Sequence, residues 1–149
     1  MRVGICVLCI ALTFAEKAYA SVGFSCVAAD ASIKFNVGGS FGRSVGSGIG
    51  NFGGEAEILL PVPKAARNPK FETTHLNQSW LDERDLRLAV RWLQDEPRNS
   101  PEIVLIIKAR RGRSEESPYL GGYRLMVFSP DGDGRPRNAH GTVRCTVDG

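Results

Sequence analysis

Two glutamates near the middle of the chain, Glu55 and Glu57, are the residues best placed to act as a pair of catalytic carboxylates. Residues two apart on a β-strand share one face and lie about 6–7 Å apart, a separation that the paired acids of glycoside hydrolases tolerate. With His75 as an added acid or base, they would make a hydrolase site. No other feature resembles a sugar-binding cleft, so we favour the alternative that the glutamates form a solvated strand face.

Arginines are the most distinctive surface feature of the sequence. Arg87 and Arg91 share the outward face of one expected strand, and Arg110, Arg111 and Arg113 crowd one expected loop. If these arginines converge, they would dock an anionic surface such as lipopolysaccharide, a cell-wall polymer or an acidic protein groove. The alternative, which we favour, is scattered solvated charge balanced by the acidic residues Glu83, Asp85, Glu115 and Glu116.

Metal and cofactor sites are not expected. The chain has only two histidines, His75 and His140, and lacks three or four ligands at the usual spacings of a metal site. Residues 48–53 match the Gly-x-Gly-x-x-Gly pattern, but a dinucleotide loop must open a helix, and a strand is expected to follow here. Residues 38–54 contain eight glycines, which predicts a long loop or a twisted edge strand whose sparse apolar residues reach the core.

The first twenty residues resemble a secretory signal. Arg2 gives a positive start, an apolar run follows, and Ala18-Tyr19-Ala20 is a small-x-small cleavage site. The apolar run is about twelve residues, too short to span a bilayer as a helix, although a retained membrane anchor is the alternative. We therefore predict cleavage after residue 20, no transmembrane segment in what remains, and one domain over residues 21–149.

Cleavage removes Cys6 and Cys9, so that the remaining cysteines are Cys26 and Cys145. An even number of cysteines in an exported chain predicts a disulfide. Closing a loop of roughly 120 residues stabilises a fold by about 4–5 kcal/mol in the chain-entropy account. Two buried free thiols or a metal pair are the alternatives. A periplasmic or secreted location follows, and the formal charge of +3 is too mild to predict a nucleic acid partner.

Alternation of apolar and polar residues predicts an all-β fold. About eight strands are expected, over residues 23–29, 32–37, 55–60, 72–80, 85–93, 102–109, 119–129 and 141–148. Connections are mostly short enough for antiparallel neighbours, which predicts a β-sandwich or a partly closed β-barrel. Strand parity turns both remaining cysteines inward. The first and last strands are then neighbours or face each other across the core.

The segment over residues 80–93 is open to two interpretations. Ser79-Trp80-Leu81-Asp82 resembles the start of a helix. At period two, however, Leu86, Leu88, Val90 and Trp92 face one way and charged residues face the other. We therefore favour a β-hairpin that turns at residues 82–84.

Short motifs spread over the chain resemble small exported proteins of unknown function from α-proteobacteria. These motifs are Phe24-Ser25-Cys26, Ala29-Asp30, His75-Leu76, Trp80-Leu81-Asp82, Asp85-Leu86-Arg87-Leu88, Gly122-Tyr123 and Gly141-x-Val143-x-Cys145. The resemblance implies a periplasmic location and no activity. In architecture alone, the expected fold is also similar to the disulfide-bearing β-barrel inhibitors of lysozyme in bacterial envelopes.

Together these features predict a non-catalytic binding or structural module of the cell envelope. Its expected partner is an envelope protein or an anionic envelope component, with no cofactor. Two alternatives remain: an inhibitor of a cell-wall hydrolase, and a hydrolase with its site around Glu55, Glu57 and His75.

Overall fold

A computed structural model describes residues 22–42, 48–93, 100–130 and 134–148. The predicted signal peptide and its cleavage site lie outside these residues. Within them, no helix has the length and apolar character needed to cross a membrane. The strands are β1 (Val22–Ala29), β2 (Ile33–Phe41), β3 (Ile49–Ile58), β4 (Lys70–Glu72), β5 (Leu76–Leu81), β6 (Asp85–Leu93), β7 (Glu102–Arg111), β8 (Tyr119–Phe128) and β9 (Arg137–Asp148). Two 3₁₀ turns, η1 (Lys64–Ala66) and η2 (Thr73–His75), complete the described elements.

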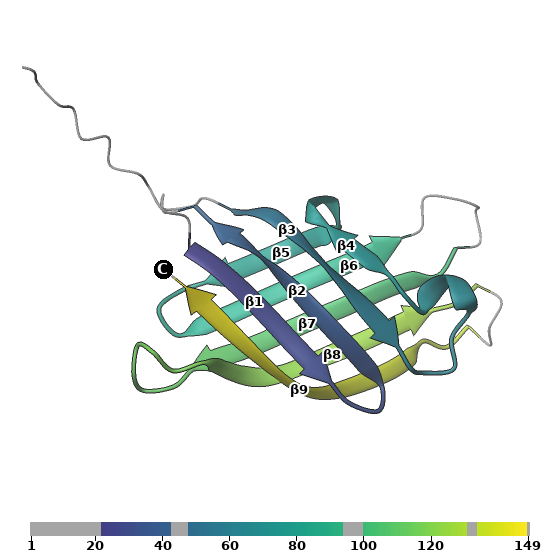
Figure 1. Cartoon of the computed structure of the whole chain (residues 1–149). Helices are drawn as coiled ribbons and strands as arrows, with labels where there is room; N and C mark the ends of the chain where they lie inside the picture. The colour runs from purple at the N-terminus through teal and green to yellow at the C-terminus, as the bar shows by residue number, and fades with distance from the viewer. Residues whose placement is uncertain (1–21, 43–47, 94–99, 131–133, 149) are drawn as a thin grey trace, which may run out of the picture.

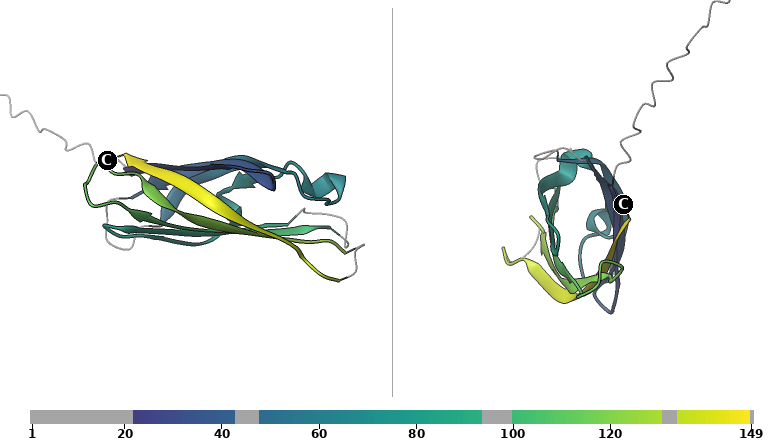
Figure 2. Two further views of the ribbon diagram at one scale, coloured as in Figure 1. Left: turned by 90° about the horizontal axis from the view of Figure 1, so that it is seen from below. Right: turned by 90° about the vertical axis from the view of Figure 1, so that its left-hand side faces the viewer.

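All nine strands belong to one antiparallel sheet in the order β4-β3-β2-β1-β9-β8-β7-β6-β5. The sheet curls into a nearly closed barrel. In Figure 1, β1, β2, β3 and β9 cross in front of β5 to β8, and the end-on view in Figure 2 shows a flattened ring. The predicted all-β fold with antiparallel neighbours is therefore confirmed, with nine strands in place of about eight.

Strict alternation explains how these strands fill the barrel. In β6, Leu86, Leu88 and Val90 are buried while Arg87 and Arg91 are exposed. The next strand, β7, buries Ile103, Leu105 and Ile107. Among the described residues, no polar or charged side chain is buried. The interior is therefore an apolar core, and polar chemistry is confined to the outside and the ends of the barrel.

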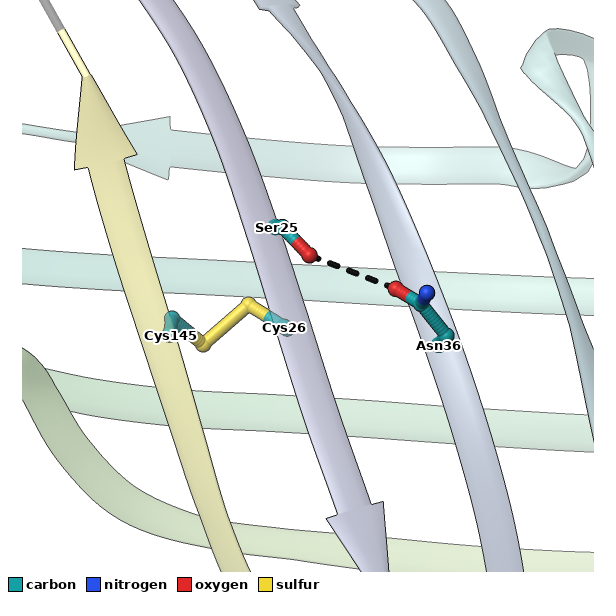
Figure 3. Close-up of a disulfide and its surroundings, with 4 residues drawn as sticks. All are labelled: Ser25, Cys26, Asn36 and Cys145. Atoms are coloured by element: carbon teal, nitrogen blue, oxygen red, sulfur yellow. Dashed lines mark hydrogen bonds between the residues drawn. A yellow bond between two sulfur atoms is a disulfide. The ribbon is translucent and has the colours of Figure 1, made fainter.

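The first and last strands are neighbours, and a disulfide joins them. Cys26 of β1 stands directly opposite Cys145 of β9, with their Cα atoms 4.0 Å apart. Both residues are fully buried, and Figure 3 shows their bond linking the two strands. On the other side of β1, the Ser25 hydroxyl donates a 3.2 Å hydrogen bond to the Asn36 side chain on β2. The predicted disulfide and the inward direction of both cysteines are confirmed.

Most of the glycine-rich segment, residues 38–54, forms strands and not the long loop that was one of the two expectations. Strand β2 continues through Phe41, and β3 begins at Ile49. Phe41, Ile49 and Phe52 are buried, because pairing with two neighbours supplies ladder hydrogen bonds that outweigh the low strand propensity of glycine. At Gly54 φ is +152°, and a Cβ atom would collide with the backbone of Asn36. The twisted-strand alternative is the one that forms, although β2 lies inside the sheet and not at its edge.

Residues 76–93 form a hairpin, not a helix, but the first predicted strand, over residues 72–80, starts too early. Glu72 ends β4, and η2 follows before β5 begins at Leu76. The Glu72 backbone N–H donates a 2.9 Å hydrogen bond to Nδ1 of His75, which stabilises this 3₁₀ turn. Strand alternation through residues 72–75 gave no sign of the turn, because the turn depends on capping of the backbone by the side chains of Glu72 and His75.

Candidate functional site

The residues of the hydrolase hypothesis do not meet. Glu55 and Glu57 lie on the outer face of β3, where the Lys34 ammonium group lies 3.1 Å from the Glu57 carboxylate. His75 lies in η2 with its Nδ1 occupied by the backbone of Glu72. Both glutamates line a hollow of about 990 Å³ on the outside of the barrel, and His75 does not.

That hollow crosses six strands, β1 to β4, β8 and β9, on the outer face. Lys70 of β4 lies at one side and Leu120 of β8 at the other, with Glu55, Asn36, Val27 and Arg144 between them. These residues belong to one lateral row of the sheet, in which Glu55 pairs with Asn36, Asn36 with Val27, Val27 with Arg144 and Arg144 with Leu120. The hollow therefore offers charges of both signs over an apolar floor.

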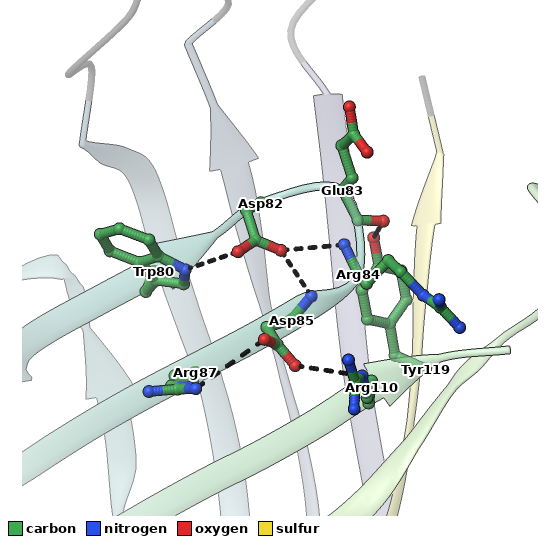
Figure 4. A network of polar contacts seen from close by, with 8 residues as sticks. All are labelled: Trp80, Asp82, Glu83, Arg84, Asp85, Arg87, Arg110 and Tyr119. Atoms are coloured by element: carbon green, nitrogen blue, oxygen red, sulfur yellow. Dashed lines mark hydrogen bonds and ion pairs between the residues drawn. The ribbon is translucent and has the colours of Figure 1, made fainter.

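Two of the predicted binding arginines converge on one carboxylate. The Arg87 guanidinium lies 3.8 Å and that of Arg110 lies 3.7 Å from the Asp85 oxygens, as Figure 4 shows. A third, Arg91, donates a 2.6 Å hydrogen bond to Glu102. This hydrogen bond, and then the charge of Glu102, raises the pKa of Arg91. Arg87, Arg91 and Arg110 therefore share the outer face of β6 and β7.

The other two predicted arginines lie apart from that face. Arg111 pairs across the sheet with the buried Tyr119, and its guanidinium lies 5.9 Å from the centre of the tyrosine ring. Burial raises the pKa of Tyr119, although the positive charge of Arg111 acts in the opposite direction. Arg113 is exposed in the turn after β7. The expected loop is thus partly strand, and strand parity separates Arg110 from Arg111.

Three further cations surround a glycine on the same outer face. Lys108 of β7 is the direct neighbour of Gly122 on β8, at about 5 Å between such partners. Arg124 lies two residues along β8, and Arg144 lies diagonally across on β9, each at about 6–8 Å. Within the described part of the chain, Lys108, Arg124 and Arg144 make no ion pair. Only the lateral register of the strands reveals this cluster, and that register could not be obtained from one sequence.

The turn between β5 and β6 fixes an exposed aromatic side chain. One oxygen of Asp82 accepts hydrogen bonds from the backbone N–H groups of Arg84 and Asp85, and the other accepts one from Nε1 of Trp80 at 3.2 Å. The backbone donors lower the pKa of Asp82 most, and the indole N–H adds to this. Trp80 is nevertheless 59% exposed. From the sequence, Trp80 is assigned to a possible helix start and to the end of a predicted strand, and to no binding role.

Among the described residues, no group of three His, Cys, Asp or Glu side chains is arranged to hold a metal ion. No protein-family model, curated protein or solved structure matches this chain. The fold places the described ionisable side chains outside an apolar barrel, where they can bind a ligand that approaches the sheet from solvent.

Proposed function

We propose that this protein is a non-catalytic binding module of the bacterial cell envelope, periplasmic or secreted, that binds an anionic envelope component. One observation carries the proposal: the paired stretches of β6 to β9 present far more positive than negative charge outward. The outward cations are Arg87, Arg91, Lys108, Arg110, Arg124 and Arg144, and the outward carboxylates are Asp85, Glu102 and, at the end of β9, Asp148. We call this surface the basic face.

Charge pairing within the basic face supports the same assignment. Asp85 pairs with Arg87 and Arg110, and Glu102 pairs with Arg91. The remaining cations of the basic face, Lys108, Arg124 and Arg144, are therefore left to bind a ligand. An arginine guanidinium matches phosphate and carboxylate groups with two parallel hydrogen bonds. The buried disulfide supports an oxidising compartment, and the envelope is where anionic polymers and such a compartment coincide.

Binding to purified lipopolysaccharide and to short-chain polyphosphate, measured at low and high salt, tests the proposal. A triple variant, Lys108→Gln with Arg124→Gln and Arg144→Gln, is expected to bind about tenfold more weakly if each exposed contact contributes a few tenths to 1 kcal/mol. The matched control, Lys64→Gln with Arg67→Gln and Lys70→Gln, removes the same charge elsewhere and should retain binding. Equal loss in both variants, or no binding of the unmodified protein, would refute the proposal.

A further inference from the structure

Trp80 is an exposed aromatic side chain that is held in place. It lies on the edge strand β5, and the residue is 59% exposed. The hydrogen bond from Nε1 to Asp82 orients the indole, and Asp82 is itself fixed by two backbone N–H groups of the turn. Figure 4 shows the indole extending away from this turn. An apolar ring that is both solvent-exposed and oriented is typical of a preformed contact surface.

A hollow of about 690 Å³ lies beside this ring on the outer face of β5, β6 and β7. Along one row of the sheet, Trp80 pairs with Arg87, and Arg87 pairs with Lys108. In the next row, Gln78 pairs with Ala89, and Ala89 pairs with Ile106. Ala89 and Ile106 are half-buried although they face outward, so they form an apolar floor. The short side chain of Ala89 leaves the space that the longer neighbours enclose.

We infer that this hollow binds a saccharide that carries an acidic group, with one pyranose ring stacked on Trp80. A pyranose has an apolar face of C–H groups, which suits an indole and an alanine–isoleucine floor, and a rim of hydroxyl groups, which suits the Gln78 amide and the Arg87 guanidinium. A carboxylate or phosphate on the sugar lies within reach of Lys108, which has no ion-pair partner among the described residues. Volumes of about 300–1,000 Å³ are those of small-molecule sites, so the hollow accommodates a short oligosaccharide.

The inference rests on the proposed function for the charge of the ligand, and adds a sugar ring as a second feature that the protein recognises. Three probes separate the contribution of the charge from that of the ring. Tetragalacturonate has rings and charge, its fully methyl-esterified form has rings without charge, and short-chain polyphosphate has charge without rings. Binding of each is measured by calorimetry with the disulfide-bonded protein and with its Trp80→Ala variant, whose exposed position makes a folding defect unexpected.

Tryptophan fluorescence gives a second readout, because the chain has two tryptophans. In the Trp92→Phe variant Trp80 is the remaining tryptophan, and tetragalacturonate should change its emission. In the Trp80→Ala variant the remaining Trp92 should not respond. Calorimetry with the unmodified protein serves as the check if Trp92→Phe destabilises the fold.

We expect Trp80→Ala to weaken the binding of tetragalacturonate about tenfold, which is the upper range for one aromatic contact. The affinity for polyphosphate should not change. Lys108→Gln should weaken both anionic probes and leave the methyl ester unchanged. If polyphosphate binds but tetragalacturonate binding is insensitive to Trp80, the saccharide inference is wrong and the proposed function stands. If polyphosphate and tetragalacturonate both fail to bind, the proposed function is wrong as well.

Discussion

The hydroxyl of Tyr123 donates a 2.5 Å hydrogen bond to Asp30, a residue 93 positions earlier in the chain. Asp30 also accepts hydrogen bonds from the backbone N–H groups of Ser32 and Ile33, which close the turn between β1 and β2. Tyr123 is buried in β8, with its ring edge-on to Phe35. The pair therefore ties the β1–β2 turn to β8, which is separated from β1 by β9.

Removing the Tyr123 hydroxyl should destabilise the fold without disturbing the core. In Tyr123→Phe the ring still packs against Phe35, but Asp30 loses one donor. We expect the free energy of unfolding to fall by about 1 kcal/mol, the net value of one hydrogen bond whose acceptor is exposed. Urea unfolding at neutral pH measures it. An unchanged midpoint would show that the bond is replaced by water at no cost.

The same pair predicts a loss of stability in acid. Burial acts to raise the pKa of Asp30, but the hydrogen bonds from Tyr123, Ser32 and Ile33 outweigh it and hold the pKa below 3.8. Because the folded-state pKa is lowered, this contribution is complete above the unfolded pKa and disappears as pH falls through the folded value.

Unfolding free energies measured between pH 7 and pH 2 should therefore decline more steeply below about pH 4 in the native protein than in Asp30→Asn. Direct titration of the Asp30 carboxyl by nuclear magnetic resonance is the independent measurement. In Tyr123→Phe the pKa of Asp30 should rise toward its ordinary value, and an unmoved pKa would contradict the assigned cause.

The disulfide should contribute a large share of the stability. Cys26 and Cys145 are 119 residues apart in sequence, and opening a loop of that length costs about 4–5 kcal/mol in the chain-entropy account. The double variant Cys26→Ala with Cys145→Ala should lower the unfolding free energy by that order, as measured with urea. Reduction of the native protein should have the same effect. Full stability after reduction would mean that the sheet alone sets the fold.

Gly141 should not tolerate a side chain. A Cβ atom there would lie 2.3 Å from an Asp30 carboxylate oxygen and 2.6 Å from the Tyr123 ring. Gly141→Ala should destabilise the protein by about 1–3 kcal/mol, the usual range for overpacking. Gly23→Ala in β1 is the matched control, because a Cβ at Gly23 meets no atom within 4 Å. Equal melting temperatures for the two variants would contradict this account.

Residues whose pattern is local could be predicted from the sequence. The alternation of Leu86, Leu88 and Val90 correctly predicted a strand and not a helix for β6. Strand parity correctly predicted that Cys26 and Cys145 both face inward. Both signals arise because each strand buries one face.

Residues whose role depends on distant neighbours could not be predicted. The cluster of Lys108, Arg124 and Arg144 exists because three strands pair in one register, and a single sequence does not determine that register. The glycine-rich strands were obscured for a similar reason. Their backbone is held by β1 and β4 on either side, and not by the preferences of glycine itself.

Because β1 lies between β2 and β9, the first strand cannot be paired on both edges until β9 has been made. Until β9 exists, β1 has one unpaired edge, and Cys26 has no counterpart. Contacts this distant in sequence slow folding, since a long loop must close before they form. A chain truncated before Cys145 thus lacks both the ladder and the covalent bond that complete the sheet. Formation of the Cys26–Cys145 bond therefore reports that the chain has been made through β9 and that β9 has paired with β1.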